Sequence, residues 1–286
     1  MAGWPSPDCS ILLSTSCGQT QHVRVPHRLA PAVPCSTYPV DVLSYTTHRP
    51  WPLPKLPWVM VQRWHDLLFA HWALPPERIR PLVPRELELD TFDGKAWVGV
   101  IPFWMSSVSF RGVTPIPTAS MFPELNVRTY VRAPQEPDKP GVYFFSLDAA
   151  SVLAVLGARA GAGLPYFWAN MRAELHGNEI RYRSVRRQSP RGAYLLARYR
   201  PIRPVSAVKT DLEKFVTERY CLYVVRSGIV HRIQIHHLPW PLQPAEAEFE
   251  KNTMAAVHGI ELPPEKPILQ FSKFLEVYIF APERIG

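Results

Sequence analysis

The chain has 286 residues, of which 47% are hydrophobic and 20% charged, and these proportions are typical of a globular protein rather than a disordered one. Its net charge is +8, and its 32 prolines exceed the usual share of roughly 5%, so we expect many short elements rather than long helices. No run of about 18 uncharged apolar residues is present, and the first residues lack the basic start of a leader peptide. We therefore expect a cytoplasmic protein without a membrane span.

Residues 1–57 differ from the rest of the chain. They hold many prolines, three of the four cysteines and no sustained periodicity, which predicts a disordered extension. The alternative is that translation starts at Met60 and the extension is not made. We expect a single domain over residues 58–286. Cys221 is the only cysteine there and no C-x-x-C motif occurs, so neither an internal disulfide nor a zinc site is expected.

The predicted elements of this domain are mostly strands, indicated by β-branched and aromatic enrichment, with a few short helices. In chain order, the pattern predicts a helix over Pro75–Leu82, strands over Ala96–Phe103, Leu125–Val131 and Val142–Leu147, and a helix over Ala149–Arg159. It then predicts a hairpin of Trp168–Leu175 and Ile180–Arg187, a strand over Tyr194–Tyr199, and a helix opened by the capping box Thr210-Asp211-Leu212-Glu213. The remaining elements are a hairpin of Tyr220–Val225 and Ile229–His236, a helix over Ala245–His258 and a strand over Leu275–Phe280. The fold class expected is α+β and mostly antiparallel β, closed or nearly closed as a barrel.

One predicted strand carries a row of polar side chains. Because side chains alternate along a strand, the same face presents Glu124, Asn126, Arg128 and Tyr130, while apolar residues occupy the other. A half-exposed strand shows the same alternation with its polar row in water. An acid, an amide, a guanidinium and a phenol in one row also resemble the lining of a polar cavity. The alternation alone leaves both interpretations open.

Other chemistry-bearing residues are weaker signals. His71 lies in the apolar stretch Phe69-Ala70-His71-Trp72, and the spacing of the histidines favours a hydrogen-bonded buried histidine over a metal ligand. Eight arginines lie between residues 181 and 203 with no acid among them, but no nucleic-acid motif accompanies them. No dinucleotide-binding fingerprint and no G-x-S-x-G motif occurs. We therefore predict no metal and no cofactor, and we regard nucleic-acid binding as a minor alternative.

Six stretches together resemble one bacterial family, the domain of unknown function 2071 or YqjF-like family, over about residues 58–282. They are Trp64–Trp72, Phe122–Val131, Val142–Ala149, Ala158-Arg159 followed by Leu164-Pro165-Tyr166, Thr217–Tyr220 and His237–Leu242. That family is similar to a distant branch of the acetoacetate decarboxylase superfamily. The resemblance implies a decarboxylase-like β-barrel with a central cavity and a few short helices, and it implies that Glu124 corresponds to a cavity glutamate.

The same resemblance exposes a departure. Acetoacetate decarboxylases carry a Pro-Lys-Lys segment whose first lysine forms a Schiff base with the substrate. The corresponding residues here are Pro165-Tyr166-Phe167, and no lysine occurs between Lys139 and Lys209. Tyr166 cannot form the imine on which that decarboxylation depends. We therefore do not expect the decarboxylase activity.

Three functions remain as hypotheses. The first is an enzyme acting on a small carboxylate or keto acid, with Glu124 and Tyr166 as catalytic residues. Its ligand would be bound by Arg128 or Arg159 through a bidentate pair, with Asn126, Tyr130 and His71 completing the site. The second is a barrel that binds a small ligand without converting it. The third is an interaction protein that binds an acidic partner through the arginine-rich hairpin, by which we mean the strands that carry the eight arginines between residues 181 and 203. Self-association into a homo-oligomer also stays open.

Overall fold

The computed structural model describes residues 41–286 apart from 114–120, 188, 190–191, 207 and 286. The strands are β1 Met60–Leu74, β2 Glu88–Leu89, β3 Ala96–Phe110, β4 Phe122–Ala133, β5 Glu136–Ala149, β6 Tyr166–His176, β7 Glu179–Arg186, β8 Tyr194–Pro201, β9 Cys221–Arg226, β10 Ile229–His236, β11 Leu242–Asn252, β12 Ile268–Ile279 and β13 Glu283–Ile285. The helices are α1 Pro76–Ile79, α2 Val152–Ala162 and α3 Asp211–Thr217, with short 3-10 turns η1 Arg80–Leu82 and η2 Ala256–His258. This mostly-strand composition confirms the predicted fold class.

The local signals for turns and helix ends explain most of these boundaries. Ser227 and Gly228 both have positive φ, the geometry that joins two twisted strands by a two-residue turn, and they connect β9 to β10. The Thr210 and Glu213 side chains form the predicted capping box of α3. Helix α2 begins later than expected, because Ser151 caps its first turn.

The helix expected over Ala245–His258 is wrong: the structure has strand β11 there, followed by the turn η2. Ala245, Ala247 and Phe249 are half-buried, whereas the glutamates between them are exposed. This period of two is that of a strand, and it outweighs the high helix propensity of alanine and glutamate because the partly buried face packs on the core.

Thirteen strands form one sheet in the order β13-β10-β9-β5-β6-β7-β8-β11-β12-β1-β3-β4-β2, with additional pairings β10–β12 and β5–β4. Followed from partner to partner, these pairings connect β12, β1, β3, β4, β5, β9 and β10 into what we call the first ring. A second ring runs from β5 through β6, β7, β8 and β11 to β12. It closes through β1, β3 and β4, so that the two rings share β12, β1, β3, β4 and β5. The predicted closed barrel is not confirmed, since β5 and β9 are joined by the single pair Val142↔Leu222.

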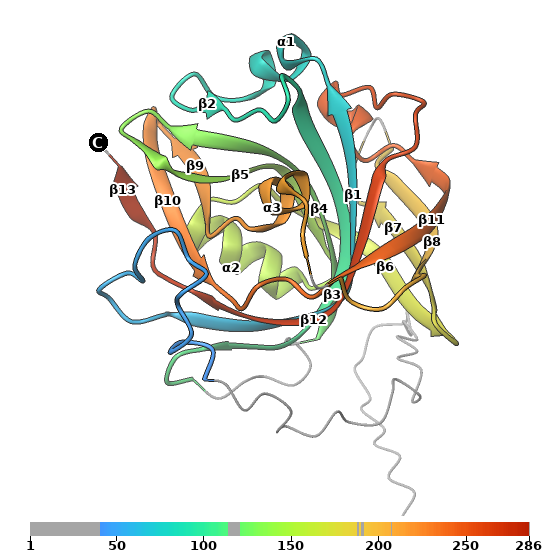
Figure 1. Ribbon diagram of the computed structural model, residues 1–286, viewed down its shortest axis with the longest axis horizontal. Coiled ribbons are helices and arrows are strands. Elements are labelled where there is room, and N and C mark those ends of the chain that lie inside the picture. The colour runs from blue at the N-terminus through green and yellow to red at the C-terminus, as the bar shows by residue number, and fades with distance from the viewer. Residues whose placement is uncertain (1–40, 114–120, 188, 190–191, 207, 286) are drawn as a thin grey trace, which may run out of the picture. The chain divides into compact units, whose positions relative to one another are not determined.

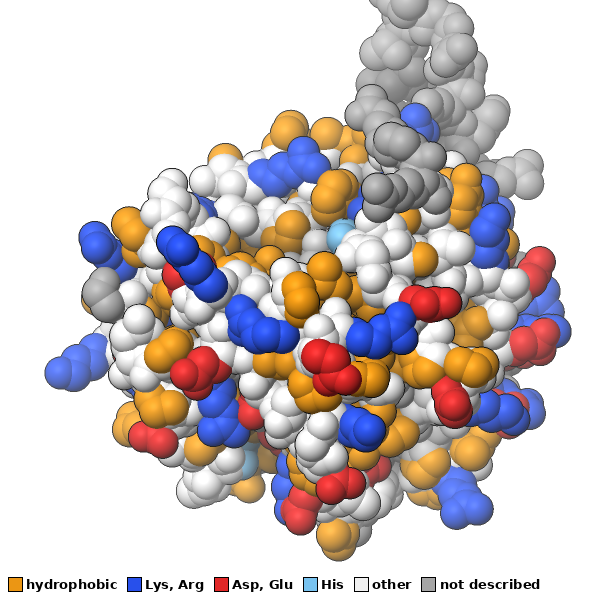
Figure 2. Space-filling model, turned by 90° about the horizontal axis from the view of Figure 1, so that it is seen from above, with side chains coloured by type: hydrophobic (Ala, Val, Ile, Leu, Met, Phe, Trp, Pro, Cys, Tyr) orange, Lys and Arg blue, Asp and Glu red, His pale blue; other side chains and the backbone are white. Residues whose placement is uncertain are grey.

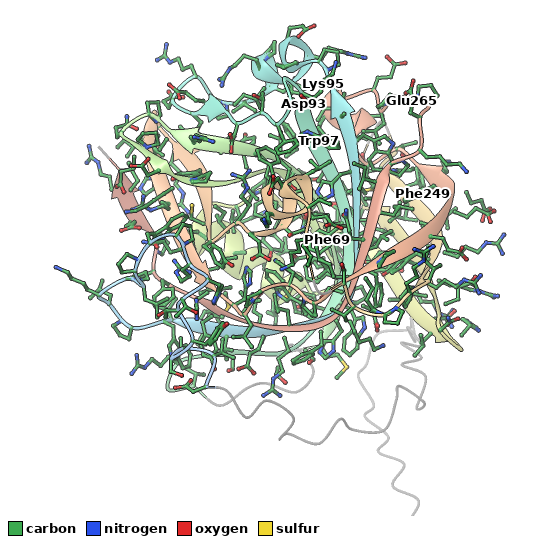
Figure 3. The ribbon with its side chains drawn as sticks, viewed as in Figure 1. Phe69, Asp93, Lys95, Trp97, Phe249 and Glu265 are labelled. Atoms are coloured by element: carbon green, nitrogen blue, oxygen red, sulfur yellow. The ribbon has the colours of Figure 1, made fainter. Side chains whose placement is uncertain are left out.

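The strands that the two rings share separate two apolar clusters. On β4, Leu125 and Val127 belong to the cluster on the second-ring side, together with Tyr182 and Tyr199. The other face of β4 belongs to the first ring, where α3 lies among the strands in Figure 1. In Figure 3, Phe69 lies beside β1, and Phe249 lies beside β11. The polar row of β4 is therefore directed into the first ring.

Residues 41–57, which the expected boundary at residue 58 assigned to the extension, pack against β10 and the loop after it. Arg49 is buried and its Nη1 donates to the carbonyl oxygen of Ile235 at 2.5 Å. The ring nitrogen Nε2 of His236 hydrogen-bonds to the carbonyl oxygen of Val42 at 2.7 Å. The packed unit therefore includes part of the predicted extension, while residues 1–40 lie outside the described residues.

The helices in the described part of the chain are short. The longest, α2, has 11 residues, and none of them combines the length and apolarity needed to cross a bilayer.

Candidate functional site

The polar row of β4 is buried rather than solvated. Glu124, Asn126, Arg128 and Tyr130 are each at most 9% exposed, and the opposite row is buried as well. A strand covered on both faces cannot be the half-exposed strand of the alternative interpretation. The row therefore lies in the interior, and each of its members needs a hydrogen-bond or charge partner.

Glu124 and Tyr166 meet at one end of the row. Tyr166 begins β6 beside Leu147 of β5, and its hydroxyl donates to Oε2 of Glu124 at 2.8 Å. Burial raises the pKa of Glu124 to about 8, a rise that the Tyr166 hydrogen bond opposes and the neighbouring charge of Asp148 reinforces. Burial and the adjacent carboxyl also hold the pKa of Tyr166 well above its ordinary value. At neutral pH Glu124 therefore carries a proton that it can donate.

Arg128 and Tyr130 meet at the other end, on the end of helix α3. Arg128 donates through Nη2 to the carbonyl oxygen of Val216 at 2.9 Å, and the Tyr130 hydroxyl donates to the same oxygen at 2.7 Å. Carbonyls in the last turn of a helix lack intrahelical partners, so they accept such bonds readily. The guanidinium also lies 5.5 Å from the ring centroid of Phe69. The cation is thus held between a backbone carbonyl and an aromatic ring.

His71 is joined to this group through Tyr130. Its Nε2 lies 2.6 Å from the Tyr130 hydroxyl oxygen, which confirms the prediction of a buried, hydrogen-bonded histidine. Burial, and then the charge of Arg128, lower the pKa of His71 well below its usual value, so the ring is neutral. Gly99 pairs with both His71 and Arg128 on neighbouring strands. A Cβ at Gly99 would lie 2.9 Å from Nε2 of His71, so the glycine makes room for the imidazole.

Replacing Gly99 with Ala should therefore destabilise the protein. The added methyl group would force the His71 ring off Tyr130, and overpacking of this kind costs about 1–3 kcal/mol. Thermal unfolding measures the loss. Gly157→Ala is the matched control, because a Cβ there meets nothing within 4 Å and alanine favours helix α2. Equal melting temperatures for Gly99→Ala and the wild type would contradict this account of His71.

Several buried polar atoms of this face have no hydrogen-bond partner among the described protein groups. They are Oδ1 of Asn126, Nε of Arg128, Nδ1 of His71 and Nε1 of Trp240. Trp240 lies on the first-ring side of the shared strands, because its ring packs edge-on against Phe69 with centroids 4.8 Å apart. Buried polar groups in proteins are hydrogen-bonded in roughly nine cases of ten. Four of the twelve such atoms among the described residues lie on this interior face, and a group of unpartnered polar atoms of this kind is what a polar ligand could bind.

The structure does not bring Arg159 into this group. Its side chain is exposed at the end of α2, and its Nε donates to the carbonyl oxygen of Tyr166 at 2.6 Å. Arg159 therefore holds the start of β6 rather than the interior, which leaves Arg128 as the interior guanidinium of the two. The lysines are likewise outside: none of the chain's eight, all at described positions, is buried. Lys209 has the least exposed lysine side chain among the ion pairs, and it is bound to Glu218.

Sequence reasoning missed two partners of the site. The carbonyl of Val216 carries no residue-type signal, because any amino acid supplies it. Trp240 was noticed within the stretch His237–Leu242 but was not assigned to the site. The available signal was a tryptophan flanked by two prolines directly after a predicted strand.

The arginine-rich hairpin is not a uniform basic surface. Arg181 pairs with Glu179, Arg198 with Glu248 and Arg200 with Glu246. On the face shown in Figure 2, basic and acidic side chains are likewise interspersed. Among the described residues, no group of three or more His, Cys, Asp or Glu is placed to bind a metal ion.

Two open surface hollows, of about 610 and 680 Å³, lie near turn η1. They share Arg80 and Arg85, and neither is lined by a residue of the β4 row. Arg80 is already bound to three backbone carbonyls. The hollows are therefore separate from the interior site.

Comparison with solved structures identifies the same fold in proteins of very different sequence. Acetoacetate decarboxylase from Legionella pneumophila is similar with a TM-score of 0.56 and 13% identity, over 88% of this chain and 98% of its own. The enduracididine biosynthesis enzyme MppR, complexed with pyruvate, has a TM-score of 0.54 and 10% identity, over 82% and 92%. An acetoacetate decarboxylase-like enzyme from Sphingomonas wittichii RW1 has a TM-score of 0.52 and 10% identity, over 81% and 94%. At these identities the similarity concerns the fold alone.

Sequence comparison is more specific. The protein YqjF of Bacillus subtilis (strain 168), described as uncharacterized, is 47% identical over 228 residues, which cover 79% of this chain and 92% of that protein. The model of the family DUF2071, described as an uncharacterized conserved protein, matches residues 61–276. The chain therefore belongs to the DUF2071 family, with an acetoacetate decarboxylase-like fold.

Proposed function

We propose that this protein binds a small carboxylate or keto acid in the interior of the first ring and moves a proton on it without forming an imine. The observation that carries the proposal is the Glu124 carboxyl, buried, hydrogen-bonded by Tyr166 and with a pKa of about 8, in a face that also holds Arg128. A buried carboxyl that carries a proton, on a face that also carries a cation, offers the groups that general acid–base catalysis uses.

Each residue has a distinct role in this proposal. Arg128 neutralises the carboxylate of the ligand and directs it by hydrogen bonding, since its Nε has no protein partner. Glu124 in its neutral form protonates the carbonyl oxygen of the ligand. In its ionised form it removes a proton from the adjacent carbon. The two steps leave the enol of the ligand and a protonated Glu124. Once that proton has exchanged with solvent, reversal of the steps returns the keto form with a solvent hydrogen on the carbon, and Tyr166 keeps the carboxyl oriented throughout.

The absence of a buried lysine supports a lysine-independent reaction. Imine formation needs an unprotonated amine facing the carbonyl carbon, and the lysines of this chain are not buried. MppR, a protein of the same fold, is complexed with pyruvate, which is a ligand of this class. The ligand class is thus compatible with the fold.

The ligand is tested by isothermal titration calorimetry with pyruvate, acetoacetate and 2-oxobutyrate. Wild-type protein should bind at least one of them, and Arg128→Met should weaken that binding by about a hundredfold, as expected for loss of a buried charge-assisted pair. Arg198→Met is the matched control, because that arginine is exposed and pairs with Glu248 at the surface, so its loss should not affect affinity. Equal affinity in the wild type and Arg128→Met would contradict the assignment of Arg128.

The proton transfer is tested by NMR in D₂O, which reports deuterium entering the carbon next to the carbonyl. The wild-type rate should fall between pH 7 and 9, because the Glu124 carboxyl, with its pKa of about 8, loses the proton with which the reaction starts. Glu124→Gln should lower the rate by about a hundredfold or more and remove the pH dependence. Binding without any exchange would leave a non-catalytic barrel, the alternative that the same polar face also allows.

A further inference from the structure

The ring nitrogen Nδ1 of His71 is a buried hydrogen-bond acceptor without a described protein partner. The carbonyl of Val216 can only accept, so the Tyr130 hydroxyl gives it its single proton over 2.7 Å. The 2.6 Å contact between that hydroxyl and Nε2 of His71 must then have the imidazole as donor. A neutral imidazole carries one N–H, so Nδ1 of His71 holds a lone pair. No described protein group donates to it.

The position of this lone pair follows from the packing of the ring. The Nε2–Cδ2 edge of His71 lies against the place that a Cβ of Gly99 would take, at 2.9 and 3.1 Å. Nδ1 therefore lies on the other side of the ring, away from β3. Two consecutive hydrogen bonds lead from Nε2 to the Val216 oxygen, and a third leads from there to Arg128. The acceptor and the cation are thus parts of one connected group.

The unpartnered atoms of this face are of both kinds. Nε of Arg128 and Nε1 of Trp240 are donors, whereas Nδ1 of His71 and Oδ1 of Asn126 are acceptors. A simple keto acid anion has acceptors but no O–H or N–H, so it satisfies only the first two. A hydroxy acid brings the same carboxylate and adds a donor. Leaving a buried acceptor without a donor is unfavourable, so the second ligand fits the face better.

We infer that the ligand of this site is a small hydroxy acid, whose hydroxyl group donates to Nδ1 of His71 while its carboxylate is bound by Arg128. The inference rests on the proposed function, since it uses the same interior site and the same arginine, and the proposed proton transfer then applies to hydroxy acids that also carry a carbonyl group. It narrows the ligand from carboxylates in general to those with a hydroxyl group near the carboxylate. His71 is then the residue that distinguishes the hydroxy acid from the matching keto acid.

The test compares matched pairs that differ only at one oxygen-bearing carbon. Calorimetry is carried out with lactate and pyruvate, 2-hydroxybutyrate and 2-oxobutyrate, and 3-hydroxybutyrate and acetoacetate. In at least one pair the hydroxy acid should bind about tenfold more tightly, the value of one additional hydrogen bond in a buried site. His71→Gln, which retains a side-chain N–H but lacks Nδ1, should remove that preference, so that the hydroxy acid and its matching keto acid bind with equal affinity. His258→Gln is the control, because that histidine bonds to Ser146 and not to the group around Val216.

A second measurement does not depend on the folding of any variant. In wild-type protein labelled with ¹⁵N-histidine, the Nδ1 resonance of His71 should have the shift of an unprotonated nitrogen. It should move towards the hydrogen-bonded position with the hydroxy acid and not with the keto acid. Equal affinity within every pair, together with an unmoved resonance, would overturn the inference while leaving the proposed function in place. Failure of both members of every pair to bind would instead overturn the proposed function and, with it, the inference.

Discussion

Replacing Glu124 with Gln should make the free energy of unfolding much less sensitive to pH between about 4.5 and 8. The carboxyl has an ordinary pKa near 4.5 in the unfolded chain, and burial raises it to about 8 in the folded protein. Below pH 4.5 both states carry the proton, so Glu124 adds no pH dependence. Between the two values the folded state holds a proton that the unfolded state has released, so stability falls as pH rises and levels off above pH 8.

The comparison is made by urea unfolding at pH 5, 6, 7, 8 and 9. Relative to Glu124→Gln, the wild type should lose on the order of 3 kcal/mol across this range. Asp148, whose pKa burial raises to about 6, contributes a slope of the same sign, but it is present in both proteins and largely cancels. Parallel pH profiles for the two proteins would mean that Glu124 is ionised in the folded state at neutral pH.

Replacing Arg186 with Met should destabilise the protein by about 3–5 kcal/mol, because it leaves a buried carboxylate without its cation. Nε of Arg186 lies 2.9 and 3.1 Å from the two carboxylate oxygens of Asp148, and both residues are buried. The guanidinium also lies 4.0 Å from the ring centroid of Phe167, the residue after Tyr166. The pair therefore fixes β7 against the strands that bear the site.

Two further variants separate the buried pair from a general effect of losing an arginine. Arg198→Met removes an arginine of the neighbouring strand whose partner Glu248 is exposed, and it should leave the free energy of unfolding nearly unchanged because water solvates both charges. The double change Asp148→Asn with Arg186→Met should recover part of the loss, since no unpaired charge remains. Equal effects of Arg186→Met and Arg198→Met on urea unfolding would contradict the role of burial.

The alternation of β4 was sufficient to predict which residues share the interior face, because the period of a strand decides this locally. It could not decide whether the face is buried. That depends on α3 and on strands that pair from distant parts of the chain, such as β12 with β1. Composition misled in the case of β11, where alanine and glutamate favour a helix but their alternation fits a strand. Arg159 shows a similar limit: it bonds to the backbone of Tyr166, but its side chain is exposed and lies outside the interior group.

The group around Val216 shows what sequence patterns cannot supply. Arg128, Tyr130 and His71 could each be selected by residue type, but the atom that joins two of them is a backbone carbonyl. The direction of the hydrogen bonds, and with it the lone pair on His71, follows only from that carbonyl. In the site that we propose, the preference for a hydroxyl group therefore depends on a helix end that comes from another part of the chain.

The protein buries an acid, Glu124, and an arginine, Arg128, but no lysine amine that could form an imine with a keto acid. Sodium borohydride reduction in the presence of acetoacetate or pyruvate, followed by mass spectrometry of the whole chain and its peptides, tests this most directly. An acetoacetate decarboxylase with its Pro-Lys-Lys segment is the positive control. We predict that the DUF2071 protein gains no mass and that no lysine, Lys209 included, is modified. A stoichiometric reduced adduct on any lysine would contradict the account.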